Sequence, residues 1–424
     1  MQRRISLIPQ PQQLVLADGD LDLSTLDAIA ADPELHPLAW LLSDLLNRGT
    51  GLRLAVTGPE ADGRVLRLRL EGDRPEDLTT AAEAYRLDIA EGGVVLAAAH
   101  PAGIARGIAT LRQLLPADSL REAPAAAPVV PLVAIDDEPR LRWRGVMIDV
   151  VRHFQPKDFV LKMIDRAWLH RMNVVHLHLT DDQGWRFDVP SRPKLAEIAS
   201  WREETKIGHA RDEASGYEPT PHGGIFSVPD LREIASYARE RHIMIVPEVN
   251  LPGHARAVLA AYPELGAGQD KPVSPTFGVF EEVLEPTQAS LDFALEAYTA
   301  IGEVFEGPFV HIGGDEVPMT QWESSPSPAS SWSARAWRTC AASRPGSRRR
   351  SATTSPAWAS GSSAGTRSST AARPPRPWST CGATRPTSRR PSPRATWSWP
   401  RPSRTRTTTT TRATTPPSPC ASTA

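Results

Sequence analysis

The sequence predicts an α/β protein: a small N-terminal α/β domain followed by a (β/α)8 TIM-type barrel, of which only about the first four β/α units are encoded. Two observations lead to this prediction. From Leu141 to Glu316, apolar strand-like segments alternate with amphipathic helical segments, which indicates a parallel sheet. Each strand-like segment also ends in polar residues, and a barrel of this type builds its active site at the carboxyl ends of its strands.

The small α/β domain is predicted over residues 1–135. The spacing of its apolar residues indicates a strand at 64–70, two strands at 85–99 and a helix at 102–115. The second of these segments is predicted to hold two strands joined by a turn at Gly92 and Gly93, because glycine readily adopts positive φ. The run APAAAP at 123–128 is typical of a linker.

The first half of the barrel is predicted over residues 140–324. We expect strands at 142–151, 173–182, 243–250 and 308–316, and helices at 157–172, 227–242 and 290–305. Ser227 is the expected N-cap of the second helix, with Pro229 in its first turn. Since parallel strands present their carboxyl ends on one face, the polar residues that follow the four strands should lie together.

The tail, residues 325–424, contains only Ala, Cys, Gly, Pro, Arg, Ser, Thr and Trp. All 49 acidic residues precede it, and it holds 17 arginines and no lysine. The net charge of −1 is therefore an average over an acidic first part and a basic tail. A segment without Leu, Ile, Val or Phe has no means of burying a core, so the tail as written is predicted to be disordered.

A slip of the reading frame near residues 324–330 would explain this composition. All eight residue types have codons with G or C at the second base, and a one-base slip in a GC-rich gene moves its third codon positions into second place. In the shifted frame, residues 364–367 permit the sequence Gly-Trp-Asp-Glu. The alternative is a genuine basic tail that binds nucleic acid. Its lack of lysine and of regularly spaced arginines disfavours that alternative, and we expect no nucleic-acid partner.

The cysteine and apolar content limits the classes of protein to which this chain can belong. The three cysteines, Cys340, Cys381 and Cys420, lie in the tail, so residues 1–324 contain neither a disulfide nor a reactive thiol. No stretch approaches 18 consecutive apolar residues, which predicts no membrane partner. The first residues, MQRRISLIPQPQQ, lack the apolar core of a signal peptide. We therefore expect a cytoplasmic protein, with secretion left open.

Asp315 and Glu316 are the leading candidates for chemistry. They follow Gly313 and Gly314 at the end of the fourth strand-like segment, and glycine permits a ligand to approach the backbone closely. Two adjacent carboxyl groups repel when both are charged, which favours one of them keeping its proton. One protonated and one ionised carboxyl group are what acid-assisted glycoside cleavage requires. The alternative is a pair of solvated loop acids.

Four segments carry a specific resemblance. DVVRHF (149–154), HLHLTDDQGWR (176–186), PEVNLPGHARA (247–257) and HIGGDE (311–316) resemble, in order and spacing, the β-N-acetylhexosaminidases of glycoside hydrolase family 20. The resemblance covers about residues 1–324. It implies removal of terminal N-acetyl-β-hexosamine (GlcNAc or GalNAc) from an oligosaccharide or glycoconjugate, without a cofactor or metal. In that family the 2-acetamido oxygen of the substrate is the nucleophile, through an oxazolinium intermediate and with retention.

The resemblance also implies residue roles. Glu316 would be the general acid and later the base, and Asp315 would orient the acetamido group. Arg152, Asp181 and His254 would bind the substrate, and His178, Asp182 and Glu248 would support them from behind. His176 and His178 lie on the same face of their strand and could either line the barrel interior or support the site. Trp185 could shape the pocket or pack in the core. Asn250 is a departure, because many members are expected to have Asp there, and it leaves one supporting hydrogen bond in question.

Two other functions remain open at this point. A metal-dependent barrel hydrolase could use His176, His178, His254, His311 and Asp315 as ligands. An inactive, truncated carbohydrate-binding relative is the other, because half a barrel leaves an open sheet edge. The 424-residue chain as written is expected to be inactive and poorly soluble, whereas the frame-corrected gene is expected to encode an active enzyme.

Overall fold

The computed structural model describes residues 5–121, 127–268 and 270–324. Most of the predicted linker at 123–128 lies outside these residues. The predicted disorder and frame shift of residues 325–424 also lie outside them and stay predictions. None of the described helices is long and apolar enough to cross a bilayer.

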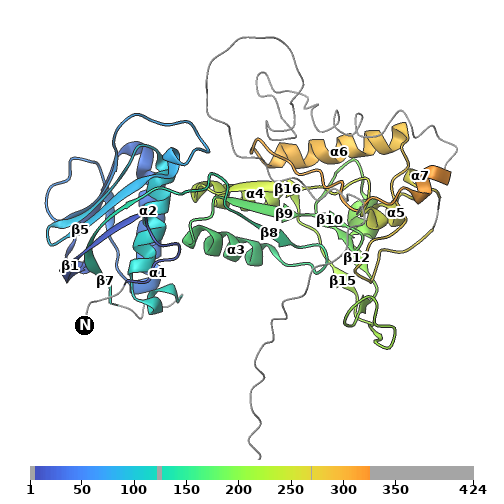
Figure 1. Cartoon of the computed structure of the whole chain (residues 1–424), viewed down its shortest axis with the longest axis horizontal. Helices are drawn as coiled ribbons and strands as arrows, with labels where there is room; N and C mark the ends of the chain where they lie inside the picture. Colours follow the sequence, from blue (N-terminus) through green and yellow to red (C-terminus); the bar gives the residue numbers. More distant parts are fainter. Residues whose placement is uncertain (1–4, 122–126, 269, 325–424) are drawn as a thin grey trace, which may run out of the picture. The chain divides into compact units, whose positions relative to one another are not determined.

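The N-terminal part is a seven-stranded sheet with two helices. Its strands are β1 (Gln13–Asp22), β2 (Ala28–Ala31), β3 (Ala55–Thr57), β4 (Val65–Leu70), β5 (Tyr85–Ala90), β6 (Gly93–Ala98) and β7 (Val129–Asp137), in the order β1-β7-β5-β6-β4-β2-β3. The helices α1 (His36–Thr50) and α2 (Pro101–Leu114) lie side by side along the sheet (Figure 1). Alternate strand residues such as Leu66, Leu68 and Leu96 are buried beneath them and form the core.

Glycines set two features of this domain. In α2, a Cβ on Gly103 would lie 2.2 Å from the carbonyl oxygen of Ala84, and one on Gly107 would lie 2.2 Å from a methyl carbon of Leu96. The helix can therefore lie this close to the sheet only because both residues lack a side chain. At the turn between β5 and β6, Gly93 has a φ of 141°, whereas Gly92 is not among the residues with positive φ. The prediction of two positive-φ glycines was thus right for one of them.

The barrel half contains three parallel strands in the order β16-β9-β8. They are β8 (Gly145–Asp149), β9 (Val174–His178) and β16 (Met244–Glu248), connected through the helices α3 (Lys157–Leu169) and α4 (Val228–Glu240). Helix α6 (Gln288–Val304) packs against α4 (Figure 1). In register, Asp149 pairs with His178 and His178 with Glu248, so the polar ends of all three strands are level.

The predicted fourth strand at 308–316 is only a single bridge, between Glu248 and His311. Its hydrogen bonds still follow a parallel pattern, because His311 N–H donates to Pro247 O at 2.9 Å and Val249 N–H donates to His311 O at 3.1 Å. The extension ends at Gly313 and Gly314, whose φ angles of 64° and 82° are incompatible with a strand. No described strand pairs with its far side. The prediction was right about the position of the segment and wrong about its length.

The start of α4 shows why local sequence fixes this helix. The Ser227 side chain accepts a hydrogen bond from the Asp230 N–H, and the Asp230 carboxylate accepts one from the Ser227 N–H. This reciprocal capping box satisfies two amide groups that the first turn leaves unpaired. Lys157 at the start of α3 then forms an ion pair with Asp230 at 2.9 Å. The predicted N-cap is confirmed, and it also ties the two helices together.

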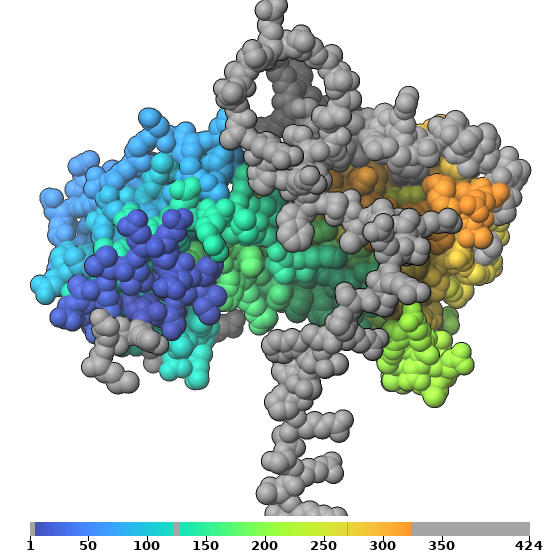
Figure 2. Space-filling view, viewed as in Figure 1, coloured from blue at the N-terminus to red at the C-terminus, as the bar shows by residue number. Residues whose placement is uncertain are grey.

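Apart from a 3-10 turn at Pro263–Leu265, the other described elements of the barrel half lie in long loops at the carboxyl ends of the strands. They are β10 (Thr180–Asp181), β11 (Gly184–Trp185), a π-helical turn (Leu195–Ala199), β12 (Trp201–Arg202), β13 (Thr205–Lys206), β14 (Tyr217–Glu218), β15 (His222–Gly223), α5 (Arg256–Ala261) and α7 (Thr320–Ser324). The excursion between β12 and β15 projects from the surface (Figure 2, yellow-green). Trp185 is fully buried, packs against Phe187 and Phe293, and donates its indole N–H to Phe187 O. Among the two roles considered for it, the structure supports core packing.

A buried ionic network joins the N-terminal sheet domain to the barrel half. Glu83, 4% exposed, forms ion pairs with Arg106 at 3.2 Å and with Arg144, and it accepts a hydrogen bond from Asn173 at 2.8 Å. Arg106, 1% exposed, also donates to His242 O at 2.6 Å. A buried carboxylate tolerates the loss of water only with such a set of partners. The network therefore makes the two parts depend on each other.

Candidate active site

Asp181 lies at the centre of the site. It follows β9, is 1% exposed, and has three cationic partners. Its Oδ2 lies 2.7 Å from Nη2 of Arg152 and 2.9 Å from Nε2 of His178, and its Oδ1 lies 3.1 Å from Nδ1 of His254. These partners come from the ends of β8 and β9 and from the loop after β16. The strand ends therefore meet as the sequence predicted, through one shared carboxylate.

Opposite charges determine the protonation of these groups. Burial disfavours the charged form of each, but the hydrogen bonds and charges of their partners outweigh it. The pKa of His178 rises to about 9 because Asp181 and Glu248 flank it. The pKa of His254 rises to about 10 because Asp181 and Asp182 flank it, while the pKa of Asp181 falls well below its usual range. At neutral pH His178 and His254 are therefore protonated and Asp181 is ionised.

Asp182 holds the loop that carries His254. It is fully buried, its Oδ2 lies 3.0 Å from Nδ1 of His254, and its Oδ1 accepts a hydrogen bond from the Arg256 N–H at 3.0 Å. Burial raises the pKa of Asp182, the contact with His254 opposes that rise, and the charge of Asp181 adds to it. His254 itself has a φ of 48°, a left-handed conformation that a histidine adopts only when its surroundings impose it. Asp182 supplies part of that constraint.

Glu316 contacts the outer face of His254. Its Oε2 lies 3.4 Å from Nε2 of His254, and its side chain is 59% exposed. Glu316 also has a left-handed φ, of 51°. A chain of contacts therefore runs from the buried carboxylates through the imidazole to an exposed carboxyl group. Such an arrangement can orient Glu316 for proton transfer to a ligand in solvent.

Asp315 is held by Asn250, the residue at which the sequence departs from the expected pattern. The Asn250 side-chain N–H donates to Oδ1 of Asp315 at 3.0 Å, and its Oδ1 accepts the Gly314 N–H at 2.9 Å. The supporting hydrogen bond that the departure left in question is present. Because asparagine carries both a donor and an acceptor, one buried side chain fixes both the loop and the carboxylate.

Replacing Gly313 with Ala is expected to lower the free energy of unfolding and to release Asp315. A Cβ at this position would lie 2.0 Å from the Oδ1 and 2.6 Å from the Cα of Asn250, and φ is 64°. Urea unfolding should show a loss on the order of 2 kcal/mol, from backbone strain together with displacement of Asn250. The matched control is Gly72→Ala, where φ is 86° and nothing lies within 4 Å. Equal losses for the two variants would contradict the role assigned to Asn250.

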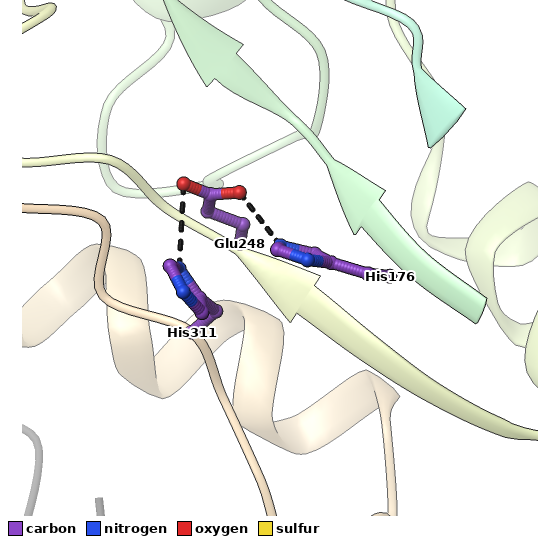
Figure 3. A group of neighbouring side chains, drawn as sticks. All are labelled: His176, Glu248 and His311. Carbon is purple, nitrogen blue, oxygen red and sulfur yellow. Dashed lines mark ion pairs between the residues drawn. The ribbon is translucent and has the colours of Figure 1, made fainter. Parts of the chain in front are cut away.

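Glu248 is a second shared carboxylate. Its Oε2 lies 2.6 Å from Nε2 of His176, and its Oε1 lies 3.3 Å from Nδ1 of His311 (Figure 3). The same Oε2 lies 2.9 Å from Nδ1 of His178. The neighbouring histidines favour the charged form of Glu248 and lower its pKa despite its burial. Sequence reasoning placed Glu248 and His178 in support of the site. His176 was predicted, like His178, to line the barrel interior or to support the site. His311 was considered only as a metal ligand, although the histidine of HIGGDE was a visible signal.

Arg152 lies between the carboxylates that hold it and the solvent. Its Nη1 and Nη2 form ion pairs with Asp149 at 2.8 Å and Asp181 at 2.7 Å, and its side chain is 27% exposed. Asp149, which the sequence analysis did not single out, also accepts the backbone N–H groups of Val151 and Arg152. Two carboxylates therefore hold the guanidinium in one orientation. Its role in contacting sugar hydroxyls stays a prediction.

The structure connects all eight predicted site residues. Seven of them, Arg152, His178, Asp181, Asp182, Glu248, His254 and Glu316, are linked by direct contacts, and Asp315 is reached through Asn250. The five ligands of the metal-hydrolase alternative do not gather around one point. His176 and His311 group with Glu248, whereas His254 groups with the two aspartates or with Asp315 and Glu316. The geometry gives that alternative no five-ligand site.

Raising the pH is expected to weaken the fold through His254. Its folded-state pKa is about 10 and its ordinary value is 6.5, so the folded state binds the extra proton between these values. The stabilisation is complete below pH 6.5 and is lost as the pH rises toward 10. Over this window, urea unfolding should show stability falling by on the order of 1 kcal/mol per pH unit more in the wild type than in His254→Asn. Asn tolerates the left-handed φ, and parallel curves would contradict the assignment.

Comparison with known proteins places this site in a family. The model described as "Glycosyl hydrolase family 20, domain 2" matches residues 4–138, and "Glycosyl hydrolase family 20, catalytic domain" matches residues 141–342. A β-N-acetylhexosaminidase of Cellulomonas fimi is 35% identical over 320 residues, which are 74% of this chain and 60% of the relative. A β-hexosaminidase of Akkermansia muciniphila is 38% identical over 251 residues, which are 58% of this chain and 48% of the relative.

Solved structures agree with this placement. The β-N-acetylhexosaminidase from Streptomyces coelicolor A3(2) superposes with a TM-score of 0.63 at 35% identity, over 73% of this chain and 60% of that one. This chain thus spans about half to three-fifths of the relatives named here. The predicted fold class, a small α/β domain followed by the first units of a TIM-type barrel, is confirmed. Matches to both domain models and to these relatives show that the chain belongs to glycosyl hydrolase family 20.

Proposed function

We propose that this chain carries the catalytic carboxyl pair of a β-N-acetylhexosaminidase, a hydrolase that removes terminal non-reducing N-acetyl-β-hexosamine from oligosaccharides or glycoconjugates. One observation carries the proposal most. His254 bridges the buried Asp181–Asp182 pair and the exposed Glu316, next to an Asp315 that Asn250 holds in place. The names of the relatives support the activity, and the N,N'-diacetylchitobiase of Vibrio harveyi, 33% identical over 260 residues, supports GlcNAc-containing substrates.

In the proposed reaction the two carboxyl groups act on different atoms. Asp315 holds the 2-acetamido group so that its carbonyl oxygen attacks the anomeric carbon as the glycosidic C–O bond breaks. Glu316 gives its proton to the leaving oxygen. The resulting oxazolinium ion carries positive charge, which the Asp315 carboxylate stabilises. Glu316 then takes a proton from water as the water attacks the anomeric carbon, which restores the acetamide and retains the configuration.

The other residues position this pair. A proton on His254 leaves its Nε2–H as a donor toward Glu316, and Asp181 and Asp182 hold the ring from the opposite side. Arg152 is fixed at the rim by Asp149 and Asp181, where its exposed edge can donate to sugar hydroxyls. These contacts pre-organise the site before a substrate arrives, which is the main requirement for electrostatic catalysis.

The test of this proposal compares proteins with and without the later barrel strands. A family barrel needs its later strands to complete the sugar pocket, and we propose that a shifted frame after residues 324–330 encodes them. The 424-residue chain and a gene with the single-base correction should be expressed side by side and assayed with 4-nitrophenyl N-acetyl-β-D-glucosaminide. We expect nitrophenol release from the corrected protein alone. Lack of activity in a folded corrected protein would refute the proposed function, and full activity in the 424-residue chain would refute the need for the correction.

A further inference from the structure

Three side chains from three neighbouring strand positions converge on one point of the barrel half (Figure 3). His176 comes from β9, Glu248 ends β16, and His311 lies on the segment bridged to β16. The imidazole rings of His176 and His311 are tilted by 41°, and their centroids are 4.7 Å apart. One ligating atom from each of the three residues lies within 4.8 Å of the other two.

The contact between His176 and Glu248 leaves polar atoms unsatisfied. Nε2 of His176 and Oε2 of Glu248 lie 2.6 Å apart, and both atoms are shielded from solvent. Neither atom has a hydrogen bond among the described residues, so the short distance does not come with hydrogen-bond alignment. Buried polar atoms without a partner are destabilising and rare, so these two atoms need an explanation.

His311 presents the same conflict at the other oxygen of Glu248. Its Nδ1 accepts the Gly313 N–H at 3.1 Å and lies 3.3 Å from Oε1 of Glu248. If Nδ1 carries a lone pair, two acceptors face each other, and if it carries a proton, the Gly313 N–H loses its acceptor. In either form one polar group is left unsatisfied. A cation bound by Nδ1 uses the same lone pair, so the Gly313 N–H gives up this acceptor. In exchange, the repulsion between Nδ1 and Oε1 of Glu248 is removed, and Nε2 of His176 and Oε2 of Glu248 gain a partner.

We propose that His176, Glu248 and His311 bind one divalent transition-metal ion of the Zn²⁺ type. Imidazole nitrogen with carboxylate oxygen is a donor set that suits such ions, at about 2.0–2.2 Å from each atom. Neighbouring ligand atoms on tetrahedral zinc lie about 3.3 Å apart. The present separations of 2.6 Å and 3.3 Å therefore need only a small adjustment. His311 is 50% exposed, which gives the ion an entry route and an open position for water.

The site is separate from Glu316 and does not depend on the proposed glycosidase activity. It is nevertheless coupled to the candidate active site, because Oε2 of Glu248 also lies 2.9 Å from Nδ1 of His178. An ion on Glu248 competes with that contact. Metal binding at this position thus offers a route by which an ion can disturb the His178–Asp181 pair.

In the experiment, the purified 424-residue chain is titrated with Zn²⁺ alone, and the heat of binding is measured by isothermal titration calorimetry. Cys340, Cys381 and Cys420 must first be alkylated with iodoacetamide, since thiolates also bind zinc. We expect one bound ion per chain with micromolar affinity. Affinity should weaken as the pH is lowered, because ligating imidazoles must lose their protons. No saturable binding to the alkylated chain overturns the proposal.

Variants locate the ion. His311→Gln removes an exposed ligand and should weaken binding at least about tenfold, with unchanged far-ultraviolet circular dichroism. The matched control is His209→Gln, which removes another exposed histidine and should bind like the wild type. A third variant, His254→Asn, tests the competing group formed with Asp181 and Asp182. Loss of binding in His254→Asn together with normal binding in His311→Gln overturns the assignment.

Discussion

Replacing Glu316 with Gln in the frame-corrected protein is expected to lower kcat/KM for 4-nitrophenyl N-acetyl-β-D-glucosaminide by about 100- to 10,000-fold, the usual contribution of a general acid–base. Gln keeps the size of the side chain and its contact with His254, but it cannot transfer a proton. Both kcat and kcat/KM should fall together, because the proton moves only as the transition state forms.

The matched control for this variant is Glu323→Gln, an exposed acid in α7. It should leave both kinetic constants near those of the wild type. If Glu316→Gln raises KM and leaves kcat unchanged, Glu316 binds the substrate, and another carboxyl group is the general acid. Asp315 would then be the first candidate, since it lies beside Glu316 and has a fixed hydrogen-bond partner.

Glu83→Ala should cost about 3–5 kcal/mol of unfolding free energy in the 424-residue chain, the typical loss when one partner of a buried ion pair is removed. The variant leaves the 1% exposed Arg106 without its carboxylate, and it removes the acceptor of the Asn173 amide. Urea unfolding followed by tryptophan fluorescence measures the change. The urea midpoints of the sheet domain and of the barrel half should fall together, because the network contacts both.

Glu60→Ala provides the comparison, because Glu60 is an exposed acid of the same domain. Its unfolding free energy should stay within about 0.5 kcal/mol of the wild type. A similarly small loss for Glu83→Ala would mean that water replaces the carboxylate among the arginines. The network would then not be the element that joins the sheet domain to the barrel half.

Local signals predicted helices α2, α3, α4 and α6 and the positions of strands β4, β5, β6, β8, β9 and β16. No segment was predicted for helix α1 or for strands β1, β2, β3 and β7. Ser227, Pro229 and Asp230 announce the start of α4 within four residues, because capping depends only on neighbouring backbone groups. Strand length at 308–316 could not be predicted in the same way. Whether an apolar segment becomes a full strand depends on partners on both sides, and only β16 pairs with it among the described strands.

In the candidate site, too, local motifs predicted some features and long-range contacts escaped prediction. Motifs placed Asp181, His254 and Glu316 at the strand ends, and the structure links them. Sequence alone did not indicate that Asn250 would hold Asp315, because the two are 65 positions apart and an amide in place of a carboxylate suggested a lost contact. The Glu83 network escaped prediction for a related reason. Its partners, Arg144 and Asn173, lie 61 and 90 residues away, and no short-range pattern marks such a contact.

The Glu83 network has a practical consequence for anyone who shortens the gene. A fragment that begins near residue 140 would keep Arg144, Arg171 and Asn173 and discard Glu83 and Asp137, which neutralise or accept from them. Three polar side chains would then face outward from a surface shaped to be covered. Expression of the barrel portion by itself should accordingly yield inclusion bodies, and the preceding domain should be treated as an indispensable half of one folding unit.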